Sequence, residues 1–150
     1  MFRRDLMLAL ALAAAVTFPA MAGDEPAPQG DFSDAVAARL LQQVTQGFIT
    51  NNRGQVLSAF NAGRMKNYAQ FSENIAALFA KYESFRASYR LRQSWPQGQR
   101  GVVLVDFELE GTPLEEGSPP FRRSAQLRFE FERAPGGWKI VDVAPRGFFS

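Results

Sequence analysis

The sequence contains no cysteine and no histidine among its 150 residues. The absence of cysteine excludes disulfides, thiol nucleophiles and thiolate metal ligands. The absence of histidine excludes catalysis by Ser-His-Asp or Cys-His arrangements, together with most zinc and iron sites. Only Asp, Glu, Tyr, Lys and Arg remain for acid–base chemistry. We therefore expect neither a metal site nor a bound cofactor.

The first 22 residues have the three zones of a cleavable secretion signal. Arg3 and Arg4 form a positive start, an apolar run follows from Leu6 to Phe18, and Ala20 and Ala22 supply the small residues that precede cleavage. The alternative is a membrane-spanning helix, but that needs about 20 apolar residues, and no other apolar stretch is long enough. We expect cleavage after Ala22 and an exported protein, periplasmic or secreted, with no membrane anchor.

Loss of residues 1–22 leaves a nearly neutral chain. The whole sequence has 17 basic and 15 acidic residues, and the signal removes two basic residues and one acidic residue, which leaves 15 and 14. A balanced charge gives no general attraction to nucleic acid or to an anionic membrane surface. We expect neither as a partner.

Residues 23–30 are predicted to be a flexible tether, and residues 31–150 a single domain that begins with three helices. Phe32, Val36, Leu40, Val44 and Phe48 recur every four residues, which predicts an amphipathic helix that Asp31 or Ser33 caps. A short helix is expected over residues 55–60. A third is expected from Asn67, which with Gln70 resembles a capping box.

After Tyr82 the apolar period changes to two, which predicts four antiparallel strands joined by turns. The residues expected to face inward are Phe85, Ala87, Tyr89, Leu91, Trp95, Val103, Val105, Phe107, Leu109, Ala125, Leu127, Phe129, Phe131, Trp138 and Ile140. Helices followed by a strand meander indicate an α+β domain with the helices on one face of the sheet.

Charges on the outward positions predict how neighbouring strands pair. In the first hairpin, Arg90 is expected opposite Asp106 and Arg86 opposite Glu110. In the last hairpin, the expected pairs are Phe131 with Ile140, Glu132 with Lys139, and Arg133 with Trp138. This second register also places Asp142 inward, opposite Phe129.

The last strand contains Gly136-Gly137-Trp138-Lys139-Ile140-Val141-Asp142-Val143, followed by Pro145 and Phe148-Phe149. With the preceding helices and meander, this segment resembles the nuclear transport factor 2-like superfamily, which includes ketosteroid-isomerase-like and SnoaL-like, polyketide-cyclase-like domains. The resemblance implies a strongly curved four-stranded sheet that forms a cone around the helices, with a pocket at its open end. Such cones serve as enzymes, ligand binders, dimerisation modules or interaction domains.

Asp142 is the candidate catalytic residue. An inward carboxylate on an apolar wall would have a raised pKa and could act as a general acid or base. The alternative is that Asp142 lies at the strand end and reaches solvent, Lys139 or a backbone amide. The candidate ligand-binding residues are aromatic, with ordinary core packing as the alternative: Tyr68, Tyr82, Tyr89, Trp95, Phe107, Phe129 and Trp138.

The outward charges allow two further hypotheses. Asp106, Glu108 and Glu110 share a strand face and could hold calcium, although neighbouring arginines already balance their charge. The arginines could form a basic strip for an anionic partner, although interleaved acids favour a solvated, mutually paired face: Arg86, Arg90, Arg92, Arg122, Arg123 and Arg128.

Together these patterns predict an exported, non-enzymatic domain that binds a small apolar ligand or a protein partner. Outward Val102, Leu104, Val141 and Val143 could form an apolar strip that suits a homodimer through the sheet. The alternative is a His-free enzyme of the isomerase or cyclase type that uses Asp142.

Overall fold

A computed structural model describes residues 30–150 of the chain. The predicted signal and the predicted tether up to residue 29 lie outside the described residues. Among residues 30–150, no helix combines the length and apolar character needed to cross a membrane.

The helices of the described chain are α1 (Asp34–Ile49), α2 (Arg53–Leu57) and α3 (Tyr68–Lys81). Ser33 is the N-cap of α1, and its side chain accepts a hydrogen bond from the Val36 amide, as one of the two predicted alternatives requires. Of the predicted apolar face, Leu40, Val44 and Phe48 are buried. Val36 is partly buried, and Phe32 packs on the core from the segment before the helix. The second helix begins earlier and is shorter than the expected 55–60.

The predicted capping box at the start of α3 is wrong. Asn67 adopts a left-handed φ of 56° and makes no side-chain cap, while Gln70 donates to Asn74 at 3.0 Å instead. A capping residue needs extended backbone for its side chain to reach the first free amides, and the left-handed Asn67 cannot supply this geometry.

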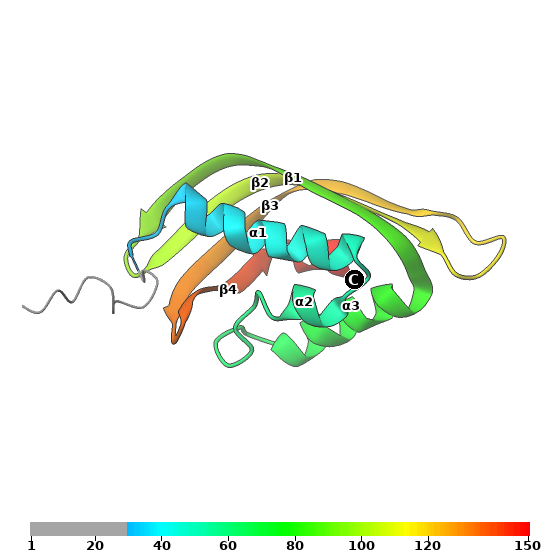
Figure 1. The fold of residues 1–150 in the computed structure, drawn as a ribbon, viewed down its shortest axis with the longest axis horizontal. Coiled ribbons are helices and arrows are strands. Elements are labelled where there is room, and N and C mark those ends of the chain that lie inside the picture. Colours follow the sequence, from blue (N-terminus) through cyan, green and yellow to red (C-terminus); the bar gives the residue numbers. More distant parts are fainter. Residues whose placement is uncertain (1–29) are drawn as a thin grey trace, which may run out of the picture.

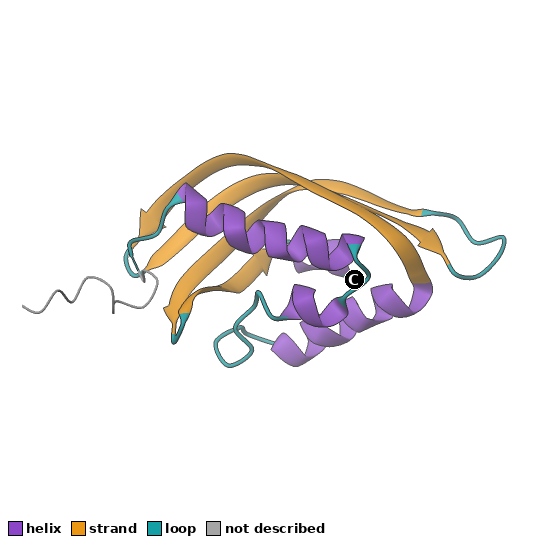
Figure 2. Cartoon of the chain, viewed as in Figure 1, coloured by secondary structure: helices purple, strands orange, loops and turns teal. Residues whose placement is uncertain are grey.

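The four strands are β1 (Tyr82–Gln97), β2 (Arg100–Pro113), β3 (Phe121–Ala134) and β4 (Gly137–Ala144), in the order β1-β2-β3-β4. They pair antiparallel and arch over the three helices, which all lie on the concave side (Figures 1 and 2). A 3-10 turn, η2 (Arg146–Phe149), follows β4. The predicted α+β architecture with a strongly curved four-stranded meander is confirmed.

The register of the first hairpin is confirmed between Arg86 and Leu91, with Arg86 opposite Glu110 and Arg90 opposite Asp106. The ion pairs differ from those expected, because these carboxylates turn to other partners. Asp106 pairs with Arg92, and Glu110 pairs at 3.1 Å with Arg122 on the neighbouring strand β3.

A β-bulge in β1 reverses the expected orientation of Trp95. The register shifts between Leu91 and Gln93, so Arg92 has no partner residue in β2. Beyond the bulge, Ser94 lies opposite inward Val103 and hydrogen-bonds Asp34 of α1. Trp95 therefore lies opposite Val102 on the convex face, and its predicted inward position is wrong. An extra residue in one strand exchanges the faces of all the residues that follow it.

A second bulge, at Val141 in β4, has the same effect. Phe131 lies opposite Ile140 and Glu132 opposite Lys139, as predicted, but the register then shifts. Val143 thereby lies opposite Phe129 on the concave face, and Asp142 lies opposite Glu130 on the convex face. The inward position predicted for Asp142 and the outward one predicted for Val143 are both wrong.

The core lies between the concave face of the sheet and the helices. Trp138 and Ile140 belong to it, as predicted, with exposed fractions of 4% and 0%. Phenylalanines from every layer meet there: the Phe48 ring of α1 lies 5.3 Å from Phe79 of α3 and 5.3 Å from Phe85 of β1. Burial of such rings is the dominant favourable contribution to this fold.

Candidate functional site

The interior of the cone, where a pocket was expected, is filled by the protein's own side chains. Phe107 and Phe129, both predicted to bind ligand, are 0% exposed. The ring centroids of Phe148 and Phe149, from η2, lie 5.6 Å and 5.8 Å from that of Phe107. The sequence prediction did not include η2 in the core, although the Pro145 and Phe148-Phe149 spacing was visible.

Two arginines hold this turn against the cone. Arg123 of β3 donates from one terminal nitrogen to the carbonyl oxygens of Gly147 and Phe148, at 2.9 Å and 2.7 Å. Arg146 pairs with Asp142 at 2.9 Å. Phe148 and Phe149 are both buried, so η2 closes the concave side.

The interior offers little polar chemistry. Within residues 30–150, Thr45 is the only polar or charged residue classed as buried, and its hydroxyl donates to the Gln42 carbonyl of its own helix. Tyr89 is half-buried, and its hydroxyl donates to the Ala38 carbonyl at 3.3 Å. Burial raises the pKa of the Tyr89 hydroxyl above its ordinary value because it disfavours the phenolate.

Asp142 is not a pocket carboxylate. Its side chain is 41% exposed and accepts hydrogen bonds from the Val143 amide, at 2.9 Å, and from Arg146. Because solvent reaches Asp142 and two donors already contact it, the apolar environment that would prepare this carboxylate for acid–base catalysis is absent.

The remaining aromatic candidates do not converge on one site. Tyr68, Tyr82 and Tyr89 are partly buried against the core from different elements, while Trp95 lies on the convex face. Tyr82 packs on Phe121 at the end of the sheet near the β2–β3 loop, with ring centroids 5.1 Å apart. Trp138 lies at the opposite end, near the two hairpin turns.

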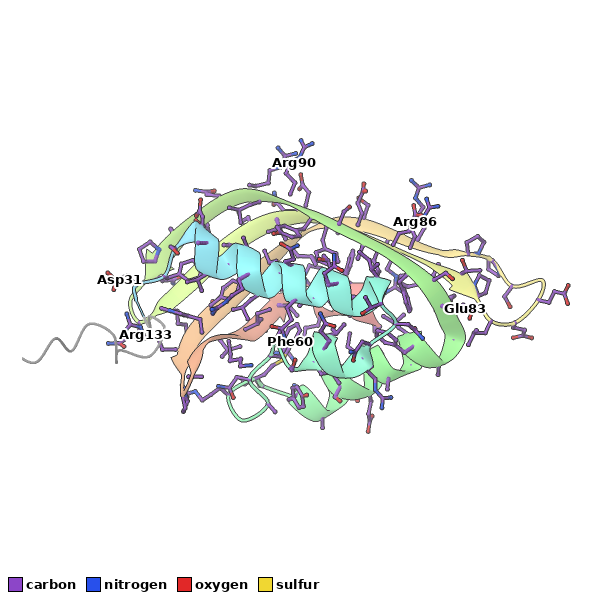
Figure 3. All side chains as sticks on the ribbon, in the orientation of Figure 1. Asp31, Phe60, Glu83, Arg86, Arg90 and Arg133 are labelled. Carbon is purple, nitrogen blue, oxygen red and sulfur yellow. The ribbon has the colours of Figure 1, made fainter. Side chains whose placement is uncertain are left out.

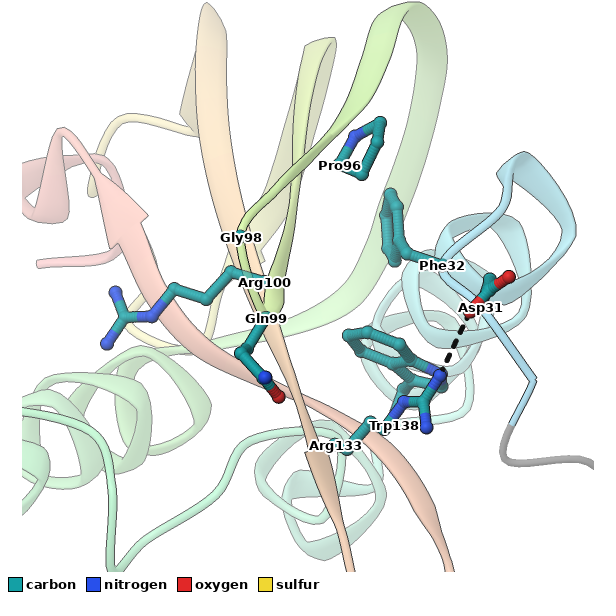
Figure 4. Close-up of a pocket in the computed structure, with 8 residues that line it drawn as sticks. All are labelled: Asp31, Phe32, Pro96, Gly98, Gln99, Arg100, Arg133 and Trp138. Carbon is teal, nitrogen blue, oxygen red and sulfur yellow. Dashed lines mark hydrogen bonds and ion pairs between the residues drawn. The ribbon is translucent and has the colours of Figure 1, made fainter.

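A cleft of about 510 Å³ lies beside Trp138, between the two hairpin turns and the segment before α1 (Figure 4). The indole nitrogen of Trp138 donates to the Gly30 carbonyl at 3.0 Å, and the Phe32 ring packs 5.4 Å from the indole. Arg133 lies over the indole and pairs with the exposed Asp31 at 3.2 Å. The indole nitrogen of Trp138 is thus already satisfied within the protein, and Arg133 already has one ion-pair partner.

The convex face of the sheet is covered by no helix of the described chain (Figure 2). Arg86 and Arg90 extend from it away from the helices (Figure 3). The other predicted basic-strip arginines, except inward Arg123, share this face with acids. Arg128 pairs with Glu130 at 3.3 Å. Charges of both signs therefore alternate over the face, and residues 30–150 contain no group of three acidic side chains placed to hold a metal ion.

Glu132 is the centre of one charge cluster on this face. Burial raises the pKa of its carboxyl, but the hydrogen bond from Arg64, at 3.0 Å, and the charges of Arg100 and Arg64 outweigh burial and hold that pKa below its usual range. Arg100 lies 2.7 Å from the other carboxylate oxygen. These pairs keep Glu132 ionised.

The predicted outward apolar strip forms only in part. Val143 faces the core, and Val102 and Val141 are buried outside the main core cluster with exposed fractions of 0% and 4%. Leu104 is half-buried on the convex face, between Gln93 and Arg128. The strip is broken because the Val141 bulge turns Val143 inward.

No protein family model and no curated protein matches this sequence. Solved structures do share its fold. A conserved protein from Planctomyces limnophilus is 12% identical, with 73% of this chain and 91% of that chain covered and a TM-score of 0.63. A putative scytalone dehydratase from Novosphingobium aromaticivorans is 9% identical, with 73% of this chain and 79% of that chain covered and a TM-score of 0.61. A nuclear transport factor 2-like superfamily protein from Salmonella enterica is 13% identical, with 71% of this chain and 89% of that chain covered and a TM-score of 0.52.

Proposed function

From the nuclear transport factor 2-like fold of this chain, we propose an exported, non-enzymatic module that binds a second copy of itself through the convex face of the sheet. The single observation that carries the proposal is the filled cone. Phe107, Phe129, Phe148 and Phe149 fill the centre of the cone, where the expected pocket would lie. We therefore expect the binding surface to lie outside the centre of the cone.

The filled cone also argues against the enzymatic alternative. A His-free isomerase or cyclase needs a carboxylate in an apolar pocket, and in residues 30–150 no carboxylate is buried. Asp142, the residue that this alternative requires, is solvated and paired with Arg146. A solvated carboxylate that already has an arginine partner lacks the apolar surroundings that acid–base catalysis by a carboxyl group requires.

Export rests on residues 1–22, whose positive start, apolar run and small residues before Ala22 match a cleavable signal. Expression of the full chain in a Gram-negative host and N-terminal sequencing of the periplasmic fraction test this part. We expect a mature chain that begins at Gly23. Full-length protein confined to the cytoplasm would contradict export.

The convex face suits a second copy because its charges are self-complementary. Leu104 lies opposite Arg128 and Asp106 opposite Gln126 on neighbouring strands. A two-fold axis between β2 and β3 places Asp106 of one copy over Gln126 and beside Arg128 of the other. No two charges of the same sign then face each other in these rows, which is the condition for an isologous contact.

Light scattering coupled to gel filtration of the purified protein tests the dimer. We expect twice the chain mass. Leu104→Arg places a guanidinium opposite Arg128 of the second copy and should give a monomer, whereas Leu104→Glu places a carboxylate there and should keep the dimer. Leu114→Arg, on an exposed loop residue, is the matched control.

Circular dichroism checks that each variant is folded. A monomeric unmutated protein, or the same mass for Leu104→Arg and Leu104→Glu, would overturn pairing through this face.

A further inference from the structure

A second cleft, separate from the convex face and from the Trp138 cleft, lies between α3 and the start of β3. Its volume is about 270 Å³, and we call it the α3 cleft. Its lining residues are Asn74, Ala77, Leu78, Lys81, Tyr82, Phe121, Arg123 and Ser150. The first four are spaced i, i+3, i+4 and i+7 and so form one face of α3. Phe121 and Arg123 are two residues apart and share the concave face of β3.

One wall of the α3 cleft is aromatic. The rings of Tyr82 and Phe121 lie 5.1 Å apart with an interplanar angle of 47°. Phe121 is buried and Tyr82 is half-exposed, so the pair presents part of its surface to the cleft. Such a wall favours a flat apolar group.

The guanidinium of Arg123 is held in place beside this wall. It lies 4.6 Å over the Phe121 ring, and one terminal nitrogen donates to the carbonyls of Gly147 and Phe148. The other terminal nitrogen and Nε have no partner within residues 30–150. These two nitrogens form one edge of the guanidinium. Such an edge has the geometry to donate two parallel hydrogen bonds to a carboxylate.

Lys81 adds a second cation at the other wall. It is the last residue of α3, its side chain is exposed, and it makes no ion pair within the described part of the chain. No acidic side chain lines the α3 cleft. The main-chain end at Ser150 also lines the cleft, but neither Lys81 nor Arg123 makes an ion pair within residues 30–150. These two cations therefore attract an anion.

We propose that the α3 cleft binds a small ligand with a flat apolar body and one carboxylate, an aryl carboxylate. The ring packs on Tyr82 and Phe121, and the carboxylate takes two hydrogen bonds from Arg123 and the charge of Lys81. The volume suits a ligand of one or two rings. The site uses no group of the proposed dimer face, so the two proposals are independent.

Calorimetry with 2-naphthoate and its neutral analogue 2-naphthamide tests the site. The two probes share the ring system and differ in charge, so we expect naphthoate to bind about tenfold tighter. Naphthoate should shift the NMR amide signals of α3 and of residues 121–123. Equal affinities, no binding of naphthoate at millimolar concentration, or shifts confined to other elements would overturn the proposal.

Variants separate the two cations. Arg123→Lys keeps the charge but loses the two-pronged edge, and should weaken naphthoate binding about tenfold. Lys81→Gln, in a solvated position, should weaken it about threefold. Lys66→Gln, an exposed lysine outside the cleft, is the matched control and should leave the affinity unchanged. If Arg123→Lys fails to fold, Lys81→Gln tests the site alone. A change in naphthoate affinity no larger than that of Lys66→Gln would then overturn the proposal.

Discussion

The ring of Phe149, in the turn after the last strand, lies 5.8 Å from the ring of Phe107 on β2 and meets it edge to face. The same ring lies 6.1 Å from Phe48 of α1 and 6.0 Å from Phe71 of α3. The Phe149 side chain therefore connects the sheet to two helices. The fold depends on this contact because η2 supplies part of the core that the cone would otherwise lack.

Phe149→Ala should lower the free energy of unfolding by about 3–5 kcal/mol, since Phe149 is 1% exposed and its removal leaves a cavity lined by other rings. Urea denaturation followed by circular dichroism measures the change. Phe79→Ala, at a half-exposed ring of the same cluster, should cost clearly less. Equal costs for the two variants would contradict the central position of Phe149.

Gly101 is needed because Phe32 packs directly on its backbone: a Cβ at Gly101 would overlap the Phe32 ring. Gly101→Ala should therefore lower the stability by about 1–3 kcal/mol. In a Phe32→Ala background, Gly101→Ala should lower the stability much less. A double-mutant cycle measures this difference.

Gly63→Ala is the control for this cycle, because its added Cβ would meet only Asn61 Oδ1, at 3.7 Å. Its effect should stay within about 0.5 kcal/mol. A cycle without coupling between Gly101 and Phe32 would show that the segment before α1 does not pack on β2 in solution.

The charge cluster around Glu132 predicts a pH dependence. Its folded pKa lies below its usual value, so the folded protein favours the ionised form more than the unfolded chain does. The resulting stabilisation is present above the unfolded pKa of about 4.3 and is lost as the pH falls through the folded pKa.

Glu132→Gln removes this contribution. The stability difference between the unmutated protein and the variant should therefore be largest near neutral pH and shrink below about pH 4. Urea denaturation at several pH values measures it. Glu108→Gln is the control, because Glu108 is an exposed carboxylate of the same face and makes no ion pair within residues 30–150. At neutral pH it should change the stability by about 0.5 kcal/mol or less. A constant difference for Glu132→Gln would contradict the pairing with Arg64 and Arg100.

Much of the fold could be predicted from periodicity, because burial of one face imposes a period of 3.6 on helices and 2 on strands. The faces of α1 and α3 and the strand meander follow from it. The opposite charges of Arg86 and Glu110 fixed the first register correctly. These features depend on neighbours in sequence or on regular pairing, which a single sequence expresses.

The two bulges were not predicted, although the apolar alternation is interrupted near each. Neither Arg92 nor Val141 is a glycine, but Gln93 follows Leu91 at the next inward position. After Ile140 the next inward position falls on the charged Asp142, while Val141 and Val143 are apolar. The faces of Trp95, Asp142 and Val143 were therefore assigned wrongly. The α3 cleft was missed for another reason: Lys81 and Arg123 lie far apart in the sequence, and no local pattern joins them.

The bulge at Val141 yields the sharpest test of the register. Val143 is 0% exposed against Phe129, so Val143→Asp buries a carboxylate without a partner and should cost several kcal/mol, roughly 3 or more, or prevent folding. Ala144→Asp, one residue further and exposed, is the matched control and should change the stability by about 0.5 kcal/mol or less.

Asp142→Asn completes this test, because the two registers predict opposite signs for it. With Asp142 on the convex face, the variant loses only a solvated pair with Arg146 and should be destabilised by about 0.2–1 kcal/mol. With Asp142 facing Phe129, removal of a buried charge would stabilise the protein instead. Thermal and urea denaturation at pH 7 distinguish these outcomes. A stabilised Asp142→Asn together with a tolerated Val143→Asp would show that the strand has no bulge.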